Sequence, residues 1–493
     1  MIRHHTWVRT LAAILPALLL FTGCSVNPAT GRQQINFFNE AEEIEMGREA
    51  DAEIVAQVGL YDDPELQAYV EDLGQSLAAR SERPDLPWSF KVLDDPAINA
   101  FALPGGYVYV TRGILSHLES EAELAMVMGH EIGHVTARHG VNQMSKQMLA
   151  MAGLGVAALL SSEMDDLAGV AALGLSLVFL KYSRDDERQA DELGLRYTER
   201  ASFDLREGPK VFDLLDRASR VEGVGRLPNW LSTHPDPGAR RSRLQEKVAA
   251  LEASGTRFEG AAVNRDSYVQ LLDGMTFGEN PREGFFRGGE FLHPDLRFRF
   301  RFPEGWTTAN EKTSVSGQSP GEDAMIQISL AEQDTVEAAA EAAFESEGLE
   351  RLRSWRREIH GSPASWNRFR LDRGQGEEDL EGMAVFLTHE GKVFQLLALS
   401  TAGGWSRHEP TAETALASFG RLTDRSALDV QPRRLEIVSL PRAMTLEEFN
   451  RQYPSTVPLD TVALANHADP ATRFAAGRLV KRVVGGKGIE DRK

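Results

Sequence analysis

Apolar positions recur at helical spacing through much of the first 250 residues. Acidic residues open a predicted helix that runs from Glu40 to Val58, because negative charge is favoured at helix N-termini. A second helix is predicted to begin after Asp63, which can cap it, with Pro64 at the first helical position. The apolar residues that follow share one helix face: Leu66, Tyr69, Val70, Leu73 and Leu77. The pattern therefore predicts a mainly helical first domain.

Short strands are predicted between these helices. Residues 88–93 alternate between apolar and polar types, and residues 107–111 are rich in β-forming types. Pro104-Gly105-Gly106 lies between two apolar stretches and predicts a hairpin turn. A strand beside an active site can bind peptide by strand addition, but the spacing alone supports a purely structural hairpin equally well.

The second half of the chain shows a different pattern. Residues 297–303 alternate strictly, which predicts a half-buried strand. Further strands are predicted at 324–330, 385–387 and 393–399, and helices at 335–352 and 410–419. Together they predict an α+β domain over residues 281–425. Residues 433–484 form a further small unit, with a strand, a helix capped by Thr445 and a final strand.

Composition limits the function classes that need to be considered. The 493 residues are too many for one ordinary core and suggest about three domains. The formal net charge of −19 argues against a general nucleic-acid binder, because phosphate contacts need a basic face. With one cysteine the chain cannot form an internal disulfide, so metal ligands are expected from His, Asp or Glu.

The single cysteine lies at an informative position. Residues 1–23 combine a basic start with a short apolar run, as in a secretory signal peptide. Thr22-Gly23-Cys24 resembles the lipobox of bacterial lipoproteins, which implies lipidation of Cys24. Ser25 then implies a periplasmic protein anchored at the inner face of the outer membrane, with residues 24–39 as a tether. The alternative is an ordinary signal peptide with a soluble product.

The strongest chemical motif is His130-Glu131-Ile132-Gly133-His134. On a helix the two histidines are one turn apart, so both rings can bind one metal ion. Glu131 can then take a proton from the attacking water, as in zinc hydrolases. The alternative is a core helix with two ordinary histidines.

A third ligand is available further along the chain. Glu187 and Asp191 are four residues apart and share a helix face. Glu187 can complete a metal site, and Asp191 can accept a ring N–H from a ligating histidine. The alternative is a solvated acidic face paired with neighbouring arginines. His139 leaves the ligand face and is expected in solvent or just outside the ligands.

Two apolar stretches separate these motifs, at residues 148–160 and 167–180. Each is short for a membrane span. Two buried or surface-associated helices are expected, and a hairpin that touches the membrane is the alternative.

The motif His130–His134 followed by S-R-D-x-E-x-x-A-D-x-x-G, from Ser183 to Gly194, resembles the HtpX/BepA-type peptidases. These belong to the gluzincin family that also contains the CAAX prenyl proteases. The resemblance implies a mainly helical zincin-type metalloprotease domain over residues 40–260, with Glu187 as zinc ligand. It also implies a substrate-binding edge strand at Asn99, Ala100 and Phe101. His234 resembles a family histidine that either steadies the oxyanion or caps the metal. The helical repeat array of BepA is not seen.

The remaining domains resemble known modules more weakly. The Phe-Pro-x-Gly-Trp sequence at residues 302–306 resembles the entry to PsbP-like α+β domains. Residues 433–484 loosely resemble LysM, which implies peptidoglycan as a partner, and a plain protein-contact module is the alternative. The expected fold class is therefore α+β, with a helical protease domain, a PsbP-like domain and a LysM-like module.

We therefore expect a zinc metalloendopeptidase with one Zn²⁺ per chain. It would hydrolyse misfolded or misassembled cell-envelope proteins, with a zinc water activated by Glu131 as nucleophile and His234 as oxyanion donor. The alternative function is a chaperone-like outer-membrane assembly or quality-control factor whose zinc site is capped. The expected partners are envelope protein substrates and the membrane through Cys24, and no nucleic acid.

Overall fold

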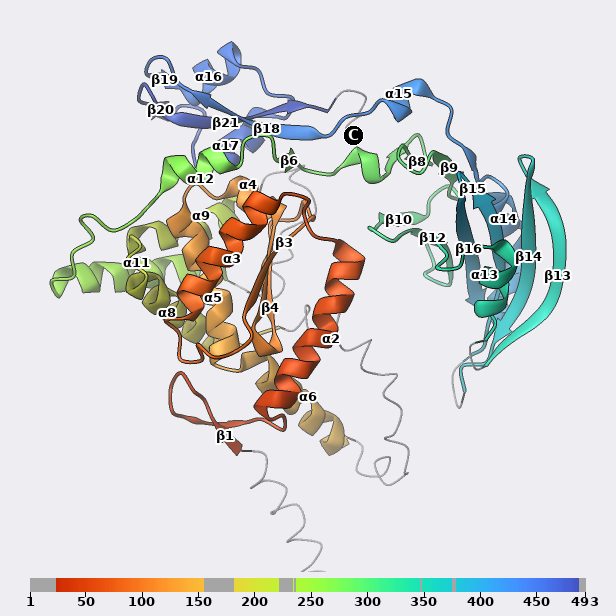
Figure 1. The fold of residues 1–493 in the computed structure, drawn as a ribbon, viewed down its shortest axis with the longest axis horizontal. Coiled ribbons are helices and arrows are strands. Elements are labelled where there is room, and N and C mark those ends of the chain that lie inside the picture. Colours follow the sequence, from red (N-terminus) through yellow and green to blue (C-terminus); the bar gives the residue numbers. More distant parts are fainter. Residues whose placement is uncertain are drawn as a thin grey trace, which may run out of the picture. The chain divides into compact units, whose positions relative to one another are not determined.

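The computed structural model describes residues 24–154, 181–220, 234, 236–345, 348–374 and 378–486 (Figure 1). The chain divides into two compact units, residues 1–278 with 434–484 and residues 279–433 with 485–493. The predicted signal peptide at 1–23 lies outside the described residues. Most of the two apolar stretches, from residue 155 to 180, also lies outside them.

The first unit opens with the two predicted helices. α2 spans Glu40–Val58 and α3 spans Pro64–Ala78. The side chain of Asp63 accepts a hydrogen bond from the backbone N–H of Leu66, and Pro64 occupies the first turn, which confirms the predicted start of α3. The apolar face of α3 is buried in the main core of this unit.

A three-stranded sheet lies beside these helices. Its order is β3-β5-β4, with β3 at Ser89–Leu93, β4 at Ala100–Leu103 and β5 at Tyr107–Thr111. β4 and β5 pair antiparallel through a tight turn at Pro104–Gly106, so the predicted hairpin is confirmed. β4 is an edge strand of this sheet among the described residues.

Two helices cross closely at the centre of the unit. α5 spans Glu121–Thr136, and α8 spans Arg184–Arg200. Ser120 caps α5, and Ser183 caps α8 in a capping box with Asp186. A Cβ at Gly194 would lie 2.8 Å from the backbone nitrogen of His130, so only glycine permits this approach of α8 to α5.

Five further helices are described between residues 24 and 278. They are α4 at Arg112–His117, α6 at His139–Leu154, α9 at Gly208–Ala218, α11 at Pro237–Ala253 and α12 at Arg265–Leu271.

Residues 24–39 differ from the expected tether. Cys24–Val26 (β1) and Gln33–Ile35 (β2) form an antiparallel hairpin. The Asn27 side chain donates to the Ala137 carbonyl at the end of α5, at 3.2 Å. The residues that hold this hairpin against the rest of the unit lie more than 100 positions away in the sequence. Local composition does not reveal such contacts and therefore suggested a flexible segment.

Residues 434–484 belong to the same compact unit as the predicted protease domain. This region comprises β18 at Arg433–Ser439, β19 at Met444–Thr445, α16 at Leu446–Gln452, α17 at Leu459–Ala465, β20 at Arg473–Phe474 and β21 at Leu479–Gly485. Thr445 caps α16, as predicted. β21 and β18 form one sheet with β6 at Thr276–Phe277, so the region is joined to the unit through backbone pairing. The LysM-like assignment stays a prediction.

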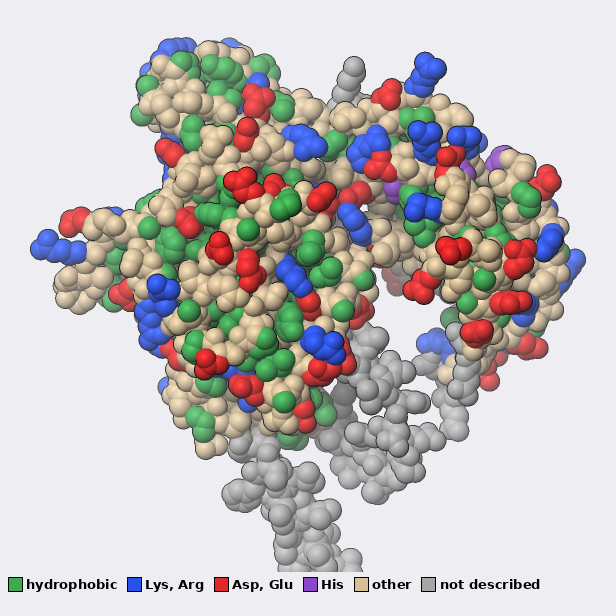
Figure 2. Space-filling model, viewed as in Figure 1, with side chains coloured by type: hydrophobic (Ala, Val, Ile, Leu, Met, Phe, Trp, Pro, Cys, Tyr) green, Lys and Arg blue, Asp and Glu red, His purple; other side chains and the backbone are tan. Residues whose placement is uncertain are grey.

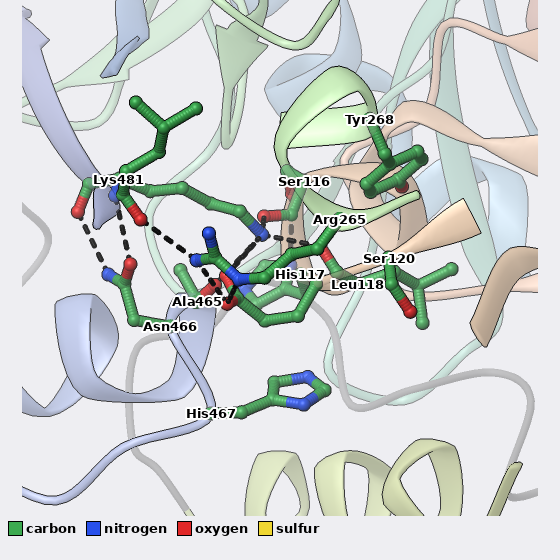
Figure 3. A network of polar contacts seen from close by, with 12 residues as sticks. Ser116, His117, Leu118, Ser120, Arg265, Tyr268, Ala465, Asn466, His467 and Lys481 are labelled. Carbon is green, nitrogen blue, oxygen red and sulfur yellow. Dashed lines mark hydrogen bonds and ion pairs between the residues drawn. The ribbon is translucent and has the colours of Figure 1, made fainter. Parts of the chain in front are cut away.

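A buried lysine fastens this region to the loop before α5 (Figure 3). The Lys481 side chain is 1% exposed. Its ammonium donates to the carbonyls of Leu118, Ala465 and Ser116 at 2.5, 2.9 and 3.2 Å, and lies 3.3 Å from Glu119. Burial lowers the pKa of Lys481, and the Glu119 carboxylate partly offsets this effect.

Replacement of this lysine should destabilise the unit. In Lys481→Met the three carbonyls and Glu119 lose the buried ammonium, so we expect the free energy of unfolding to fall by about 3–5 kcal/mol. Denaturant unfolding measures this change. Lys247→Met is the matched control, because Lys247 is exposed and pairs with Glu192 on the surface; its effect should stay within about 0.5 kcal/mol. Equal unfolding midpoints for the two variants would contradict the structural role of Lys481.

The second unit is built on a seven-stranded antiparallel sheet. Its strand order is β10-β11-β12-β16-β15-β14-β13. The strands are Thr307–Asn310 (β10), Ser314–Gln318 (β11), Ala324–Leu330 (β12), Leu349–Ile359 (β13), Ser362–Leu371 (β14), Leu380–His389 (β15) and Lys392–Thr401 (β16). Residues 324–330, 385–387 and 393–399 are strands, as predicted.

Smaller elements complete the second unit. A four-stranded sheet of order β17-β9-β8-β7 contains Gly420–Arg421 (β17), Phe298–Arg301 (β9), Glu290–His293 (β8) and Phe285–Arg287 (β7). The helices are α13 at Val336–Ala342, α14 at Ala402–Leu416 and α15 at Arg425–Leu428. On the face shown in Figure 2, acidic and basic side chains are interspersed over the described surface.

The predicted helix at 335–352 is wrong in its second half. α13 ends at Ala342, and Leu349 already begins β13. β13 pairs with β14 along its length, so cross-strand pairing outweighs the local helix propensity of this alanine- and glutamate-rich stretch. The predicted helix at 410–419 starts earlier, at Ala402, and contains Pro410.

Candidate metal centre

α5 brings the two histidines of the motif together. His130 and His134 are each 2% exposed, and their Nε2 atoms lie 3.0 Å apart. They are one helical turn apart, so both rings leave the same face of α5. Two ring nitrogens at this distance either share one hydrogen, which one ring donates to the other, or present two lone pairs to a cation between them.

α8 supplies the acidic residues. Glu187 Oε2 lies 3.6 Å from His130 Nε2, and its Oε1 lies 3.5 Å from His134 Nε2. Asp191 Oδ1 lies 3.1 Å from the other ring nitrogen of His130, Nδ1. A carboxylate at this nitrogen holds the ring in the tautomer that presents Nε2 to a metal.

His234 completes the cluster from a distant part of the chain. Its side chain is 1% exposed, and its Nδ1 lies 2.8 Å from Glu187 Oε1 and 3.3 Å from His130 Nε2. The structure thus brings together the four side chains His130, His134, Glu187 and His234. Glu131 is also buried here, with Oε1 3.9 Å from His234 Nε2.

The spacing of the donor atoms fits one zinc ion. Tetrahedral ligands at zinc–nitrogen bond lengths of about 2.0–2.1 Å lie about 3.3 Å from one another. The closest contacts among these four residues run from 2.8 to 3.6 Å, and one donor atom from each lies within 4.8 Å of the other three. The donor set of imidazoles and one carboxylate is also the chemistry that zinc prefers when cysteine is absent.

Arg240 is a functional residue that the sequence analysis missed. It lies on α11, and its guanidinium is 2.7 Å from Glu187 Oε2 and 2.6 Å from Asp191 Oδ1. The guanidinium also stacks over the Phe212 ring at 4.5 Å. Arg240 shares the buried face of α11 with Leu244 and Val248. The helical spacing of Arg240 with the apolar residues Leu244 and Val248 was the signal available in the sequence.

The charges around the cluster shift its acid–base behaviour. Burial raises the pKa of Glu187, but His234 and Arg240 outweigh burial and hold this pKa at about 2. The pKa of Asp191 is likewise lowered, because Arg240 and His130 outweigh burial. Burial and the neighbouring rings lower the pKa of His134. Both carboxyl groups are therefore ionised at neutral pH and ready to bind a cation.

Two further side chains contact the second histidine. His139 is buried, and its Nδ1 lies 3.0 Å from His134 Nδ1. Of the two expected positions for His139, the one just outside the ligands is correct. The Tyr182 ring centroid lies 4.0 Å from that of His134, and this residue was not singled out from the sequence. The only feature of the sequence that could have pointed to Tyr182 is its position directly before Ser183, the cap of α8.

A small pocket lies between the cluster and the edge strand. His134 and Tyr182 line one side, and Ala102, Leu103 and Pro104 line the other.

The predicted substrate strand is only partly available beside this pocket. Ala100 is fully buried and Asn99 is 8% exposed, whereas Phe101 and Ala102 are half-buried. Ala102 and Leu103, in the C-terminal half of β4, line the pocket, and substrate binding by Asn99, Ala100 and Phe101 stays a prediction.

Two histidines one turn apart, the glutamate between them and a glutamate from a second helix define a gluzincin-type zinc metallopeptidase domain. The model of Peptidase family M48 matches residues 64–248. The resemblance to the HtpX/BepA-type peptidases is thereby confirmed.

Three curated relatives match part of this chain. The putative beta-barrel assembly-enhancing protease of Vibrio cholerae is 35% identical over 38% of this chain and 40% of its own length. The mitochondrial metalloendopeptidase OMA1 of Arabidopsis thaliana is 34% identical over 39% of this chain and 38% of its own length. The beta-barrel assembly-enhancing protease of Escherichia coli is 30% identical over 48% of this chain and 50% of its own length. The matched part of this chain thus covers at most half of the length of each relative.

Solved structures give weaker matches. The solution structure of cyanobacterial PsbP from Synechocystis covers 27% of this chain and 91% of that chain, at 16% identity and a TM-score of 0.22. This similarity is too low to support an argument about the second unit, so a PsbP-like domain at 281–425 stays a prediction.

The contact between Asp191 and His130 predicts a change in zinc affinity. In Asp191→Asn the ring of His130 loses its carboxylate partner and Arg240 loses an ion pair, so we expect zinc to bind about 10–100-fold more weakly. Competition with a chromophoric chelator measures this affinity. The neighbouring Glu192→Gln is the control, because Glu192 is exposed and pairs with Lys247 on the surface. Unchanged zinc binding by Asp191→Asn would show that Asp191 does not orient the ligand.

Proposed function

We propose that this protein is a zinc-dependent endopeptidase that hydrolyses peptide bonds of misfolded or misassembled cell-envelope proteins. The observation that carries the proposal is the position of Glu131. This carboxylate is buried in the same cluster as His130, His134 and Glu187, on the helix whose His134 lines the pocket beside β4. A proton acceptor, a metal-binding set and a pocket at a sheet edge are the parts that metal-assisted peptide hydrolysis requires.

Each residue then has a defined task. A bound zinc ion would supply a Lewis acid that polarises the scissile carbonyl and lowers the pKa of a water. Glu131 accepts the proton of the attacking water and returns it to the leaving amine. Asp191 and Arg240 hold His130 and Glu187 in place. A substrate chain in extended form pairs with the accessible half of β4.

The envelope location is part of the proposal. Two relatives are named for the enhancement of β-barrel assembly, which supports envelope proteins as the substrate class. Cys24 follows a signal-peptide-like segment and supports a lipid anchor, with the protein at the inner face of the outer membrane. Within the part of the chain that the structure describes, no helix has the length and apolarity needed to cross a membrane.

Glu131→Gln tests the proposed peptidase. The amide cannot accept a proton from water, so we expect casein hydrolysis to fall by about 10²–10⁴-fold. Zinc content should stay near one per chain, because Glu131 is not among the four converging residues. Hydrolysis is followed by release of labelled peptides, and zinc by elemental analysis. Full activity in this variant with zinc retained would refute the proposal.

A second function, a chaperone-like assembly or quality-control factor with a capped zinc site, is favoured by one observation. His234 Nδ1 lies within 3.3 Å of ligand atoms from both His130 and Glu187, where a fourth ligand would bind. A fourth protein ligand leaves no position for water, as in structural zinc sites. In this form the protein would act mainly by binding.

His234→Ala separates the two roles of this histidine. If His234 caps the metal, its removal opens a coordination position, so we expect casein hydrolysis to rise several-fold above that of the natural protein. If instead His234 donates to the oxyanion, hydrolysis should fall by about 10²–10³-fold. Zinc content is measured in parallel, so that a loss of metal is not mistaken for a loss of the donor.

A further inference from the structure

Exposed large apolar side chains gather on one part of the first unit. Among the described residues, seven such side chains are exposed, and four of them come from β1, the segment after β2, and α6. These four are Val26 at 53%, Phe37 at 40%, Met148 at 47% and Leu149 at 37% exposed. We call them the apolar face.

Hydrogen bonds hold the contributing segments together. Asn142 on α6 donates to the Ile35 carbonyl of β2 at 2.6 Å. The backbone N–H of Phe37 donates to Ser145 Oγ, also on α6, at 3.0 Å. Met148 and Leu149 follow Ser145 by three and four positions, so they lie on the same side of α6 as the contact with Phe37. Phe37 therefore lies near Met148 and Leu149, and Val26 belongs to the β1–β2 hairpin that Asn142 holds against α6.

Cys24 is fixed beside this surface. In the β1–β2 hairpin it pairs with Ile35, whose carbonyl accepts the hydrogen bond from Asn142 of α6. Ser25 is held as well, because its Oγ accepts a hydrogen bond from the Asn36 side chain at 2.9 Å. An acyl chain on Cys24 would thus leave the protein next to the apolar face, without a flexible spacer.

We propose that the apolar face lies on the lipid bilayer surface beside the acylated Cys24. This proposal rests on the lipid anchor of the proposed function. Transfer of apolar side chains from water into the headgroup boundary is favourable. A second membrane contact therefore strengthens the membrane binding of a protein that carries one lipid anchor. Exposed charges of both signs flank the surface, at Arg32, Lys146, Glu40 and Glu42. The attraction is therefore apolar, and neutral lipids should suffice.

The proposed membrane contact would bring the pocket close to the bilayer. Gly140 and Val141 at the start of α6 line the pocket. From Gly140 to Met148 the helix rises about 12 Å, at about 1.5 Å per residue. The metal centre would then meet polypeptide segments that lie close to the bilayer, which is where a misassembled envelope protein exposes its extended strands.

Single-cysteine labelling of the lipidated protein tests the contact. Acylation would consume the thiol of Cys24, the one cysteine of the chain, so an introduced cysteine is the only free thiol. We compare a fluorophore at Met148→Cys with one at Leu60→Cys, in phosphatidylcholine vesicles whose acyl chains are brominated. Leu60 is the matched control: it is 41% exposed and lies beyond the far end of α2, whose 19 residues span about 28 Å.

We expect the bromines to quench the fluorophore at position 148 at least twofold more than at position 60. Casein hydrolysis and circular dichroism confirm that each labelled variant is folded, and Val26→Cys provides a second position on the apolar face. Equal quenching at positions 148, 26 and 60 in folded, vesicle-bound protein would overturn the proposal.

A tethered form separates this proposal from the anchor. Residues 25–493 with an N-terminal hexahistidine are recruited to brominated vesicles that carry a nickel-chelating lipid, and the same positions are compared. Mass spectrometry of the natural protein reports acylation of Cys24. Stronger quenching at position 148 than at position 60 in the tethered form supports membrane contact by the apolar face. If Cys24 then carries no lipid, only the proposed lipid anchor is wrong. If Cys24 is acylated but quenching is equal at the two positions in both forms, the lipid anchor stands and membrane contact by the apolar face is refuted.

Discussion

The close crossing of α5 and α8 is the constraint on which the metal centre depends. Gly194 brings the backbone of α8 against the backbone of His130, and Gly133 lies against Ala190 in the same way. At this separation Glu187 reaches both ligating histidines, and Asp191 reaches the outer nitrogen of His130. A side chain at the crossing would move the carboxylates away from the rings. The glycines at the crossing are therefore as necessary for the metal site as the ligands are.

Electrostatics explain why this crossing suits a divalent cation. Glu131, Glu187 and Asp191 are three carboxylates in one buried region, and Arg240 is the guanidinium that pairs with two of them. The lowered pKa values keep Glu187 and Asp191 ionised, and the guanidinium offsets one of these two charges. Buried negative charge that remains is costly without compensation, and a bound divalent metal ion supplies that compensation. The same reasoning explains why Arg240 is fully buried: it reduces the charge of the site and fixes the carboxylates that face the metal.

Short-range patterns predicted much of the structure. The spacing of His130 and His134, the caps at Asp63 and Thr445, and the Pro104–Gly106 hairpin all depend on residues close in sequence. His234 was found only through the family resemblance, because no local spacing connects it to α5.

Long-range contacts could not be predicted in this way. Arg240, the docked β1–β2 hairpin and the burial of Lys481 each depend on partners about 50 to 365 positions away. The helix expected at 335–352 failed for the same reason, since pairing with β14 decided its second half. Local propensity is a weak guide wherever a distant strand or a buried charge determines the conformation.

The crossing of α5 and α8 should hold one zinc ion through nitrogen and oxygen atoms. Zinc-edge X-ray absorption of the purified protein measures this coordination. We predict one zinc per chain with a first shell of nitrogen and oxygen at about 2.0–2.1 Å, including at least two imidazoles. A sulfur shell at about 2.3 Å, or a protein purified and reloaded without stoichiometric zinc, would contradict the account.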